Sequence, residues 1–260
     1  MIDENKIIVC DKSALNEVHL YFIGDKHVGS PCCVLSRIRK SVQDILADPA
    51  GHAVICGDLM DMGIKTAKTN TYFQTMMPEQ QKETVFELFK PLADAGKILA
   101  AVPGNHCRRN EIAVGMNPLY DICCRWHIED VYRKHYAVVK IQVGSKTKNG
   151  KPATYVGVID HGSSRATHHR WATGWDGVDF FVSGHTHRPG YDPHGKLRVD
   201  PRNNTITHLS YKEIVVDAGL DYGDYAADKN YEISPPAEMQ MLTLCGARKK
   251  MIFTSEDIAC

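Results

Sequence analysis

Short apolar runs alternate with longer amphipathic stretches in the first half of the chain. The runs are rich in β-branched and aliphatic residues and predict buried strands over 18–24, 52–57 and 97–104. The stretches between and after them predict helices over 32–48, 78–95 and from Pro118 to about Asp130. Pro78 stands at a tolerated first-turn position and Gly96 is a natural stop. Strand, helix, strand order predicts an α/β sheet with parallel strands.

The second half has a different character, with apolar runs that follow one another and little helix between them. It predicts strands over 135–144, 154–160, 178–184, 205–219 and 239–246. Segment 59–77 is polar, carries Lys65, Lys68 and Tyr72, and lacks a clean period, so it predicts a long loop. Such loops are often functional lids, and a connection of no consequence is an equal alternative. No repeat or low-complexity tract divides the chain, which favours one domain over residues 1–260.

Polar residues with metal-binding chemistry follow five of the apolar runs. They are Asp25, His27, Asp58, Asn105, His106, His161, His185 and His187. Because ligands bind at the carboxyl ends of parallel strands, we expect these residues to converge there. On an extended segment, residues two apart point to the same side, so Asp25 with His27, and His185 with His187, can each face one site. Neighbouring glycines permit tight turns and close backbone approach.

Imidazole nitrogens, carboxylates and an amide oxygen together indicate metal ligation. Seven groups, all of the above except His106, are too many for one four-coordinate ion and suit two, with Asp58 able to give one oxygen to each. Each motif alone is more typical of a cap, a turn or a satisfied core histidine. Five of them in order, each at the end of an apolar run, make that structural alternative weaker.

The ordered motifs DxH, GDxxD, GNH, HG and GHxH resemble the calcineurin-like metallophosphoesterase superfamily. The resemblance covers residues 25–187 and implies a four-layer α/β/β/α sandwich of two mixed β-sheets flanked by helices. It implies one divalent metal ion on Asp25, His27, Asp58 and His187, and a second on Asp58, Asn105, His161 and His185. The ions can be Mn, Fe, Zn, Ni or Co, because mixed nitrogen and oxygen ligands accept most of them.

Two divalent ions would leave such a centre net positive even with Asp25, Asp58 and a bridging hydroxide as ligands, so it would attract a phosphate ester. The ions would polarise phosphoryl oxygens and generate the hydroxide nucleophile. By resemblance, His106 is the general acid that protonates the leaving oxygen. Many members have Asp or Glu after GNH, whereas this chain has Cys107. Resemblance to the Ser/Thr phosphatase branch implies that Asp61 pairs with His106 and orients it, with a surface aspartate as the alternative. Met62 replaces the arginine of the protein-phosphatase branch.

The substrate class is predicted from neighbouring cations and from the branch that the motifs resemble. Arg108 and Arg109 follow His106 and can contact phosphate, with a solvated loop pair as the alternative. Segment 163–175 combines cationic side chains with Trp171 and Trp175, which can hold a nucleotide or form a structural aromatic cluster. DxHxG with GDxxD is similar to phosphodiesterases and DNA-repair nucleases, and GNHCRR with GHTHRP to small members from bacteriophage and bacterial genomes.

A phosphodiesterase acting on a nucleotide or nucleic acid is therefore the leading hypothesis. A phosphomonoesterase, acting on nucleotides or proteins, is the second. A non-catalytic binding scaffold ranks last, because scaffolds of this type lose ligands and none is missing here. The motifs leave the oligomeric state open.

Overall composition adds two constraints. Lys plus Arg and Asp plus Glu are 31 each, so the chain lacks the strong basic field of non-specific nucleic-acid or membrane-surface binders. The first residues, MIDENKIIVC, are unlike a signal peptide or a membrane span, and the nine cysteines show no CxxC spacing. These features predict no membrane association, reduced thiols and a cytoplasmic location.

Overall fold

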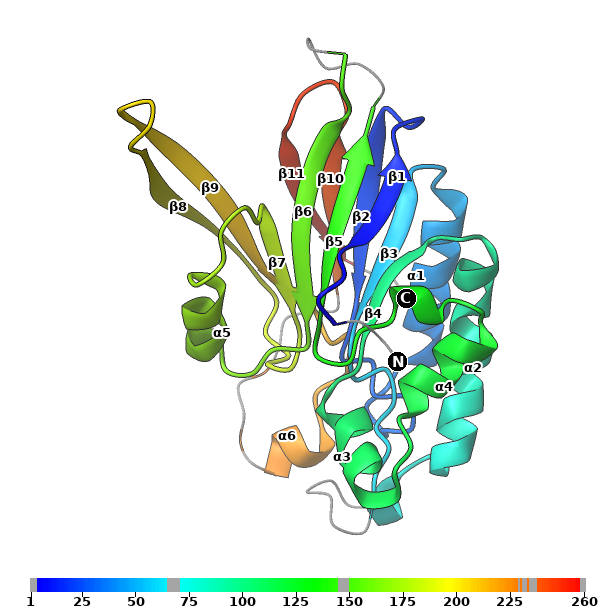
Figure 1. The fold of residues 1–260 in the computed structure, drawn as a ribbon. Coiled ribbons are helices and arrows are strands. Elements are labelled where there is room, and N and C mark those ends of the chain that lie inside the picture. Colours follow the sequence, from blue (N-terminus) through cyan, green and yellow to red (C-terminus); the bar gives the residue numbers. More distant parts are fainter. Residues whose placement is uncertain are drawn as a thin grey trace.

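Two mixed β-sheets packed face to face form the centre of the molecule (Figure 1). The computed structural model describes residues 4–64, 71–144, 150–228, 230, 233 and 238–257. The five-stranded sheet has the order β11 (Met251–Asp257), β10 (Glu238–Cys245), β2 (Glu17–Ile23), β3 (Gly51–Cys56) and β4 (Ile98–Val102). The six-stranded sheet has the order β1 (Ile8–Lys12), β5 (Tyr136–Val143), β6 (Ala153–Asp160), β7 (Phe180–Ser183), β9 (Thr205–Val215) and β8 (Gly190–Asp200).

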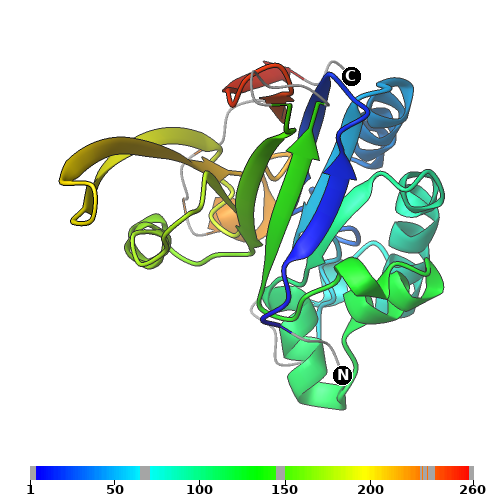
Figure 2. The same cartoon turned by 45° about the horizontal axis from the view of Figure 1, so that its top comes forward.

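Helices cover the outer faces of both sheets (Figure 2). The five-stranded sheet packs against α1 (Leu35–Ala47), α2 (Pro78–Asp94) and α4 (Pro118–Arg125). The six-stranded sheet packs against α5 (Arg165–Ala172). Two further helices are α3 (Asn105–Val114) and α6 (Asp224–Asp228), and the single turns Thr71–Phe73 and Glu129–Val131 are 3-10 helices. The predicted α/β/β/α layering is confirmed, and no helix in the described ranges has the length and apolar character to cross a membrane.

Burial explains why the strands have these sequences. Every residue of β3 is buried, because Val54 and Cys56 face the core between the sheets while Ala53 and Ile55 face the helices. In β5 only alternate residues are buried, and these, such as Val139, point into the core between the sheets. The neighbouring positions of β5 face the smaller core under α5.

The strand directions explain where the site forms. Strands β2, β3 and β4 are parallel, as predicted from their order with the helices, and β6 is parallel to β7. Antiparallel partners β10 and β11 extend the first sheet beyond β2. The carboxyl ends of these parallel strands are therefore the places from which loops leave toward a common edge.

Strands β1, β8 and β11 and helices α3, α5 and α6 were not predicted from the sequence. The sequence of β8 contains Gly195 and Pro193, which argue against a central strand, but β8 lies at the edge of its sheet and pairs only with β9. Its hairpin with β9 extends away from the rest of the molecule in both views (Figures 1 and 2). In segment 59–77 the predicted loop holds for the described residues apart from one 3-10 turn, and residues 65–70, with Lys65 and Lys68, lie outside the described ranges.

The pairing of β6 with β7 generates a stability prediction. Gly157 lies opposite Phe180, and a Cβ atom at position 157 would overlap the phenyl ring. Gly157→Ala should lower the free energy of unfolding by about 1–3 kcal/mol, because the buried ring has to move off its packed position. Gly195→Ala in β8 is the matched control, since the nearest atom to its added Cβ is at 3.9 Å. Urea unfolding followed by circular dichroism would contradict the prediction if both variants unfolded at the same midpoint.

Candidate metal centre

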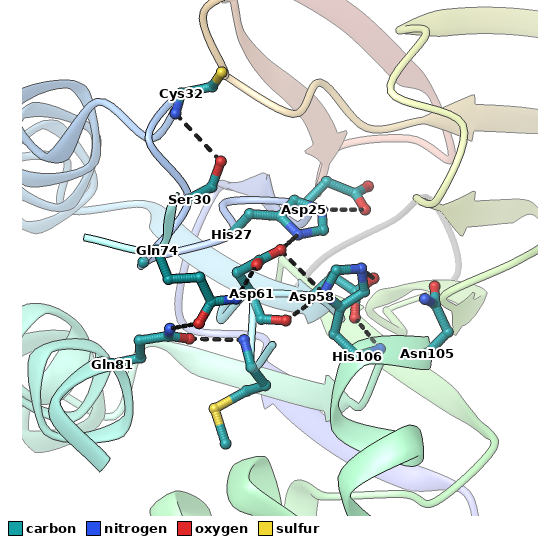
Figure 3. A network of polar contacts seen from close by, with 12 residues as sticks. Asp25, His27, Ser30, Cys32, Asp58, Asp61, Gln74, Gln81, Asn105 and His106 are labelled. Atoms are coloured by element: carbon teal, nitrogen blue, oxygen red, sulfur yellow. Dashed lines mark hydrogen bonds and ion pairs between the residues drawn. The ribbon is translucent and has the colours of Figure 1, made fainter. Parts of the chain in front are cut away.

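The predicted ligands follow the carboxyl ends of β2, β3, β4, β6 and β7, and all lie in loops except Asn105, which is the first residue of α3. Backbone hydrogen bonds hold these loops together beyond the strands. The Asp25 and His27 amides donate to the carbonyl oxygens of Gly57 and Asp58, both at 3.0 Å. The Gly184 amide donates to the His161 carbonyl oxygen, also at 3.0 Å. The loops therefore continue the pairing of the strands, and Figure 3 shows Asp25, His27, Asp58 and Asn105 together with His106.

The backbone at the predicted ligands is left-handed rather than extended. Positive φ angles occur at Asp25 (50°), His27 (43°), Asp58 (46°), His185 (70°) and His187 (53°). The prediction that residues two apart share a side because the chain is extended is therefore wrong here, although Asp25 and His27 do meet. A left-handed conformation costs on the order of 1–2 kcal/mol for a residue with a side chain. Clustering of such residues at one place is typical of functional sites, where the surrounding contacts hold the strain.

Asp25 and Asp58 each have one oxygen bound by a backbone amide and the other directed at histidines. Asp25 Oδ2 accepts from the His185 amide at 2.8 Å, while Asp25 Oδ1 accepts no hydrogen bond from the described residues. Asp58 Oδ1 accepts from the His106 amide at 2.9 Å, and Asp58 Oδ2 lies 3.0 Å from His161 Nε2. The expectation that Asp58 gives one oxygen to each ion stays a prediction, because only Oδ2 faces the histidines.

Glycines make these close approaches sterically feasible. A Cβ atom at Gly184 would overlap Asp25 Oδ2, and one at Gly104 would overlap Asp58 Oδ1. Both positions therefore exclude a side chain because a carboxylate occupies that space. This is the physical reason for the glycines in GNH and GHTH that the sequence places beside the predicted ligands.

Asp25, His27 and His187 form a first group of predicted ligands. Asp25 Oδ1 lies 3.4 Å from His187 Nε2 and 3.8 Å from His27 Nε2, and the two Nε2 atoms are 3.1 Å apart. Asp25 and His27 are buried, at 0% and 5% exposure. A carboxylate oxygen and two imidazole nitrogens that face one another in a buried place need a cation or shared protons between them.

Asp58, Asn105, His161 and His185 form a second group. Asn105 Oδ1 lies 2.9 Å from both His161 Nε2 and His185 Nδ1. His161 Nδ1 is 2.9 Å from the carbonyl oxygen of Cys56, which can only accept, so Nδ1 carries a proton and Nε2 is the nitrogen that faces Asn105 and Asp58. Ligand atoms of Asp25, Asp58 and His161 all lie within 4.8 Å of one another, which joins the two groups into one cluster.

Electrostatics inside this cluster favour charged side chains. Burial alone would lower the pKa of His27, but contacts with Asp25 and Asp61 raise it to about 9. Burial also opposes protonation of His161, and the charge of Asp58 with its hydrogen bond raises that pKa to about 10. Burial would raise the pKa values of Asp25 and Asp58, and the surrounding histidines hold both below the usual value. Without metal, His27 and His161 therefore carry protons near neutral pH.

His106 and Asp61 are in contact, as the sequence predicted. His106 Nδ1 lies 2.5 Å from the Asp61 carbonyl oxygen and 3.3 Å from Asp61 Oδ1. An unprotonated Nδ1 would place a lone pair against these oxygens, so Nδ1 carries a proton even though Arg109 Nη2 approaches it at 2.8 Å. His106 Nε2 then faces the cluster, 3.8 Å from Asp58 Oδ2. Asp61 Oδ1 also lies 3.4 Å from His27 Nδ1, so one carboxylate orients two rings.

Two glutamines that sequence reasoning missed hold Asp61 in place (Figure 3). Gln74 Nε2 donates to Asp61 Oδ2 at 2.5 Å, and Gln81 Nε2 donates to Gln74 Oε1 at 2.9 Å. Gln81 Oε1 accepts from the Met62 amide at 2.7 Å, so the row of contacts ends on the loop that carries Asp61. The sequence offered one signal for this role, because Gln81 is a polar residue on the side of α2 that buries Val85 and Phe89.

The two arginines after His106 are placed differently. Arg108 is exposed on α3. Arg109 turns inward, and its guanidinium donates to the Asp61 carbonyl oxygen beside the His106 ring. The contacts of Arg109 therefore favour a role in positioning Asp61 and His106, while Arg108 has the exposure that contact with a substrate requires.

The tryptophans of segment 163–175 belong to a structural cluster. Trp171 and Trp175 pack against Tyr136, with ring centroids 5.9 and 5.3 Å away, and Trp171 also packs on Phe181. They form part of the small core between α5 and the six-stranded sheet. The structural alternative for this segment is therefore favoured over stacking on a nucleotide.

The donor set fits divalent transition-metal ions. It combines imidazole nitrogens, carboxylate oxygens and an amide oxygen, and one buried carboxylate oxygen has no hydrogen bond with the described residues. His106 also falls within ligand range of His27 and Asp58, so geometry alone allows it as a ligand. The divalent-metal character of the site follows from these donors, and the number of ions and their identity belong to the proposal.

Comparison with known proteins gives a loose likeness of fold. No protein-family model matches the sequence, and no curated protein matches it. One similar solved structure is a conserved uncharacterized protein, a predicted phosphoesterase, from Streptococcus pneumoniae TIGR4, with 10% identity and a TM-score of 0.41 over 94% of this chain and 93% of that chain. Another is a metallophosphoesterase from Sphaerobacter thermophilus, with 15% identity and a TM-score of 0.42 over 92% and 89%. At this level of likeness, any inference about the chemistry of this chain has to rest on its own side chains.

The protonated histidines generate a pH prediction. A metal ion must displace the protons of His27 and His161, whose pKa values are about 9 and about 10 in the metal-free protein. Binding at pH 7 should therefore release about two protons per loaded chain, and affinity should rise between pH 6.5 and 8.5 as proton competition falls. Calorimetric titrations with Mn²⁺ in buffers of different ionisation enthalpy measure both quantities. Binding without proton release, or affinity that falls over this range, would contradict the assignment.

Proposed function

We propose that the chain is a metal-dependent phosphoester hydrolase, and that it acts as a phosphodiesterase on a nucleotide or a nucleic acid. One observation carries the proposal. Two buried aspartates each keep one oxygen facing histidine Nε2 atoms, directly beside a histidine whose other nitrogen is held by Asp61. This is the combination that hydrolysis of a phosphate ester needs, since it unites cation-binding groups with an oriented proton donor.

The two ligand groups would hold two divalent ions. Asp25, His27, His187 and Asp58 would hold one, and Asp58, Asn105, His161 and His185 the other. Manganese is the first ion to test, with Fe, Zn, Ni and Co as alternatives that the donor set accepts equally. When bound, the ions would supply Lewis acidity toward phosphoryl oxygens and activate water at neutral pH. The fixed loops would supply rigid support for the ligands.

His106 would donate the proton to the leaving oxygen. Its Nδ1 is bound by Asp61, so a protonated ring presents only Nε2–H to the centre. Gln74 and Gln81 hold Asp61, and Arg109 caps its carbonyl oxygen, so neither Asp61 nor the ring needs to reorganise during the reaction. General acid catalysis by an oriented side chain typically contributes about 10²–10⁴-fold to the rate.

The small number of exposed cationic side chains beside the site supports a phosphodiester substrate over a phosphomonoester. A phosphate monoester dianion carries more charge than a diester, and an arginine clamp suits it. Met62, at the position of the protein-phosphatase arginine, is buried in the core between the five-stranded sheet and its helices. Arg109 is bound to Asp61, so only Arg108 of the arginine pair is exposed. A monoanionic diester requires less positive charge beyond the ions themselves. Phosphomonoester hydrolysis is the second candidate, favoured only if Arg108 engages the substrate strongly.

Comparison of two synthetic substrates tests the proposed function. With Mn²⁺-loaded protein we expect kcat/KM for bis-p-nitrophenyl phosphate to exceed that for p-nitrophenyl phosphate by at least about tenfold, which corresponds to roughly 1.4 kcal/mol of transition-state preference. A preference for the monoester would replace the leading proposal with the second candidate. Absence of hydrolysis of both esters with every one of the five ions would favour a binding scaffold instead.

Two substitutions separate metal binding from proton transfer. His106→Asn should keep the bound metal and lower kcat by about 10²–10⁴-fold, because only the proton donor is lost. Asp58→Asn should lose both metal and activity, since its carboxylate stands between the two ligand groups. Asp94→Asn, at an exposed ion pair on α2, is the matched control and should change neither. Elemental analysis with steady-state kinetics measures both properties, and loss of metal in His106→Asn would make His106 a ligand rather than the acid.

A further inference from the structure

A second cluster of metal-binding side chains lies apart from the site above, between α5 and the β8–β9 hairpin. It consists of His169 on α5, His194 on β8 and Glu213 on β9, whose ligand atoms all lie within 4.8 Å of one another. Glu213 Oε1 is 2.7 Å from His169 Nδ1 and 3.4 Å from His194 Nε2. The ring centroids of His169 and His194 are 4.6 Å apart, and one nitrogen of each ring faces the Glu213 carboxylate.

The carboxylate at the centre of this cluster is buried. Glu213 is 6% exposed, and a buried carboxylate is retained only where cations or hydrogen bonds compensate it. His194 Nε2 is buried and makes no hydrogen bond with the described residues, although it points toward Glu213 Oε1. His168 is engaged elsewhere, because its Nε2 bonds Asp160 Oδ1 at 2.9 Å and its Nδ1 stays 3.9 Å from Glu213. Hydrogen bonding among these residues thus leaves one nitrogen unsatisfied.

We propose that His169, His194 and Glu213 bind one divalent ion of the zinc type. Two imidazoles and a carboxylate are a common donor set for zinc, with the remaining position open to water. Ligand atoms about 2.0–2.1 Å from a tetrahedral ion lie roughly 3.4 Å apart, which is the 3.4 Å separation of His194 Nε2 from Glu213 Oε1. His169 Nδ1 is closer to Glu213, at hydrogen-bond distance, and binding of the ion would displace any proton on this nitrogen into solvent.

The place of this cluster in the fold gives the ion a role. Helix α5 begins at Arg165, four residues after His161, and β8 begins at Gly190, three residues after His187. An ion that joins α5 to β8 and β9 would tie together the segments that continue from these two predicted ligands. Arg165 and Asp192 already form an ion pair at 2.7 Å between the same elements, but on the surface, where such pairs stabilise little. The ion would therefore fix the loops of the principal centre without taking part in its chemistry.

Zinc content per chain tests the inference. The double substitution His169→Ala with His194→Ala should lose about one equivalent of zinc and weaken binding at this site by at least about a hundredfold, because loss of outer-sphere partners alone costs 10–100-fold. Both side chains are partly exposed, 45% and 29%, so the substitutions leave the core intact. Glu213→Gln, which keeps the buried volume, should have the same effect. His208→Ala, at an exposed histidine of β9, is the matched control.

Zinc is measured by elemental analysis after dialysis, and affinity by competition with a chromophoric chelator. Circular dichroism confirms that each variant is folded. The inference is overturned if the double variant retains as much zinc as His208→Ala, or if Glu213→Gln binds zinc with unchanged affinity. Asp58→Asn reports separately on the principal centre. Zinc that is retained in Asp58→Asn and lost when His169 and His194 are also replaced belongs to this second site, whatever the outcome for phosphoester hydrolysis.

Discussion

Two aspartate carboxylates, Asp25 and Asp58, are removed from water at the edge where both sheets end, with exposures of 0% and 2%. An isolated buried carboxylate costs several kcal/mol, so each must be compensated by dipoles and cations from elsewhere in the chain. One oxygen of each is satisfied by a backbone amide, and the histidines surround the other. Since these partners come from both sheets, the site can form only when the two sheets pack together.

The backbone around these carboxylates shows how the site is made rigid. Five predicted ligands have left-handed φ angles, a conformation that non-glycine residues avoid unless their surroundings determine it. Here the surroundings are hydrogen bonds between loops, such as those from Asp25 and His27 to the loop after β3. Strain held in this way keeps donor atoms close together before any ion arrives. Folding would therefore order the donor atoms of the proposed metal site before an ion binds.

The sequence was sufficient to predict that the candidate ligands lie close together and that the fold is a layered α/β one, because both follow from local periodicity and from the position of polar residues at strand ends. It was insufficient for features that long-range contacts decide. The left-handed φ angles follow from pairing between loops, and Gln81 reaches Met62 across nineteen positions. Edge strand β8 forms despite Pro193 because only one neighbour requires its amides. Arg109 was predicted to contact phosphate, but its guanidinium turns inward to the Asp61 carbonyl oxygen, a contact between residues 48 positions apart that the sequence does not reveal.

His106 shows why distance alone does not define a role in such a cluster. It lies within ligand range of His27 and Asp58, as the predicted ligands do. His106 Nε2 is 3.8 Å from Asp58 Oδ2, whereas His161 Nε2 is only 3.0 Å from the same oxygen. The His161 ring is fixed in that position because its Nδ1 bonds a backbone carbonyl oxygen. His106 is held at Nδ1 by Asp61, itself fixed by Gln74. A ring held just outside the tightest contacts fits the proton-donor role that we propose for His106, because metal coordination would occupy the nitrogen that proton transfer requires.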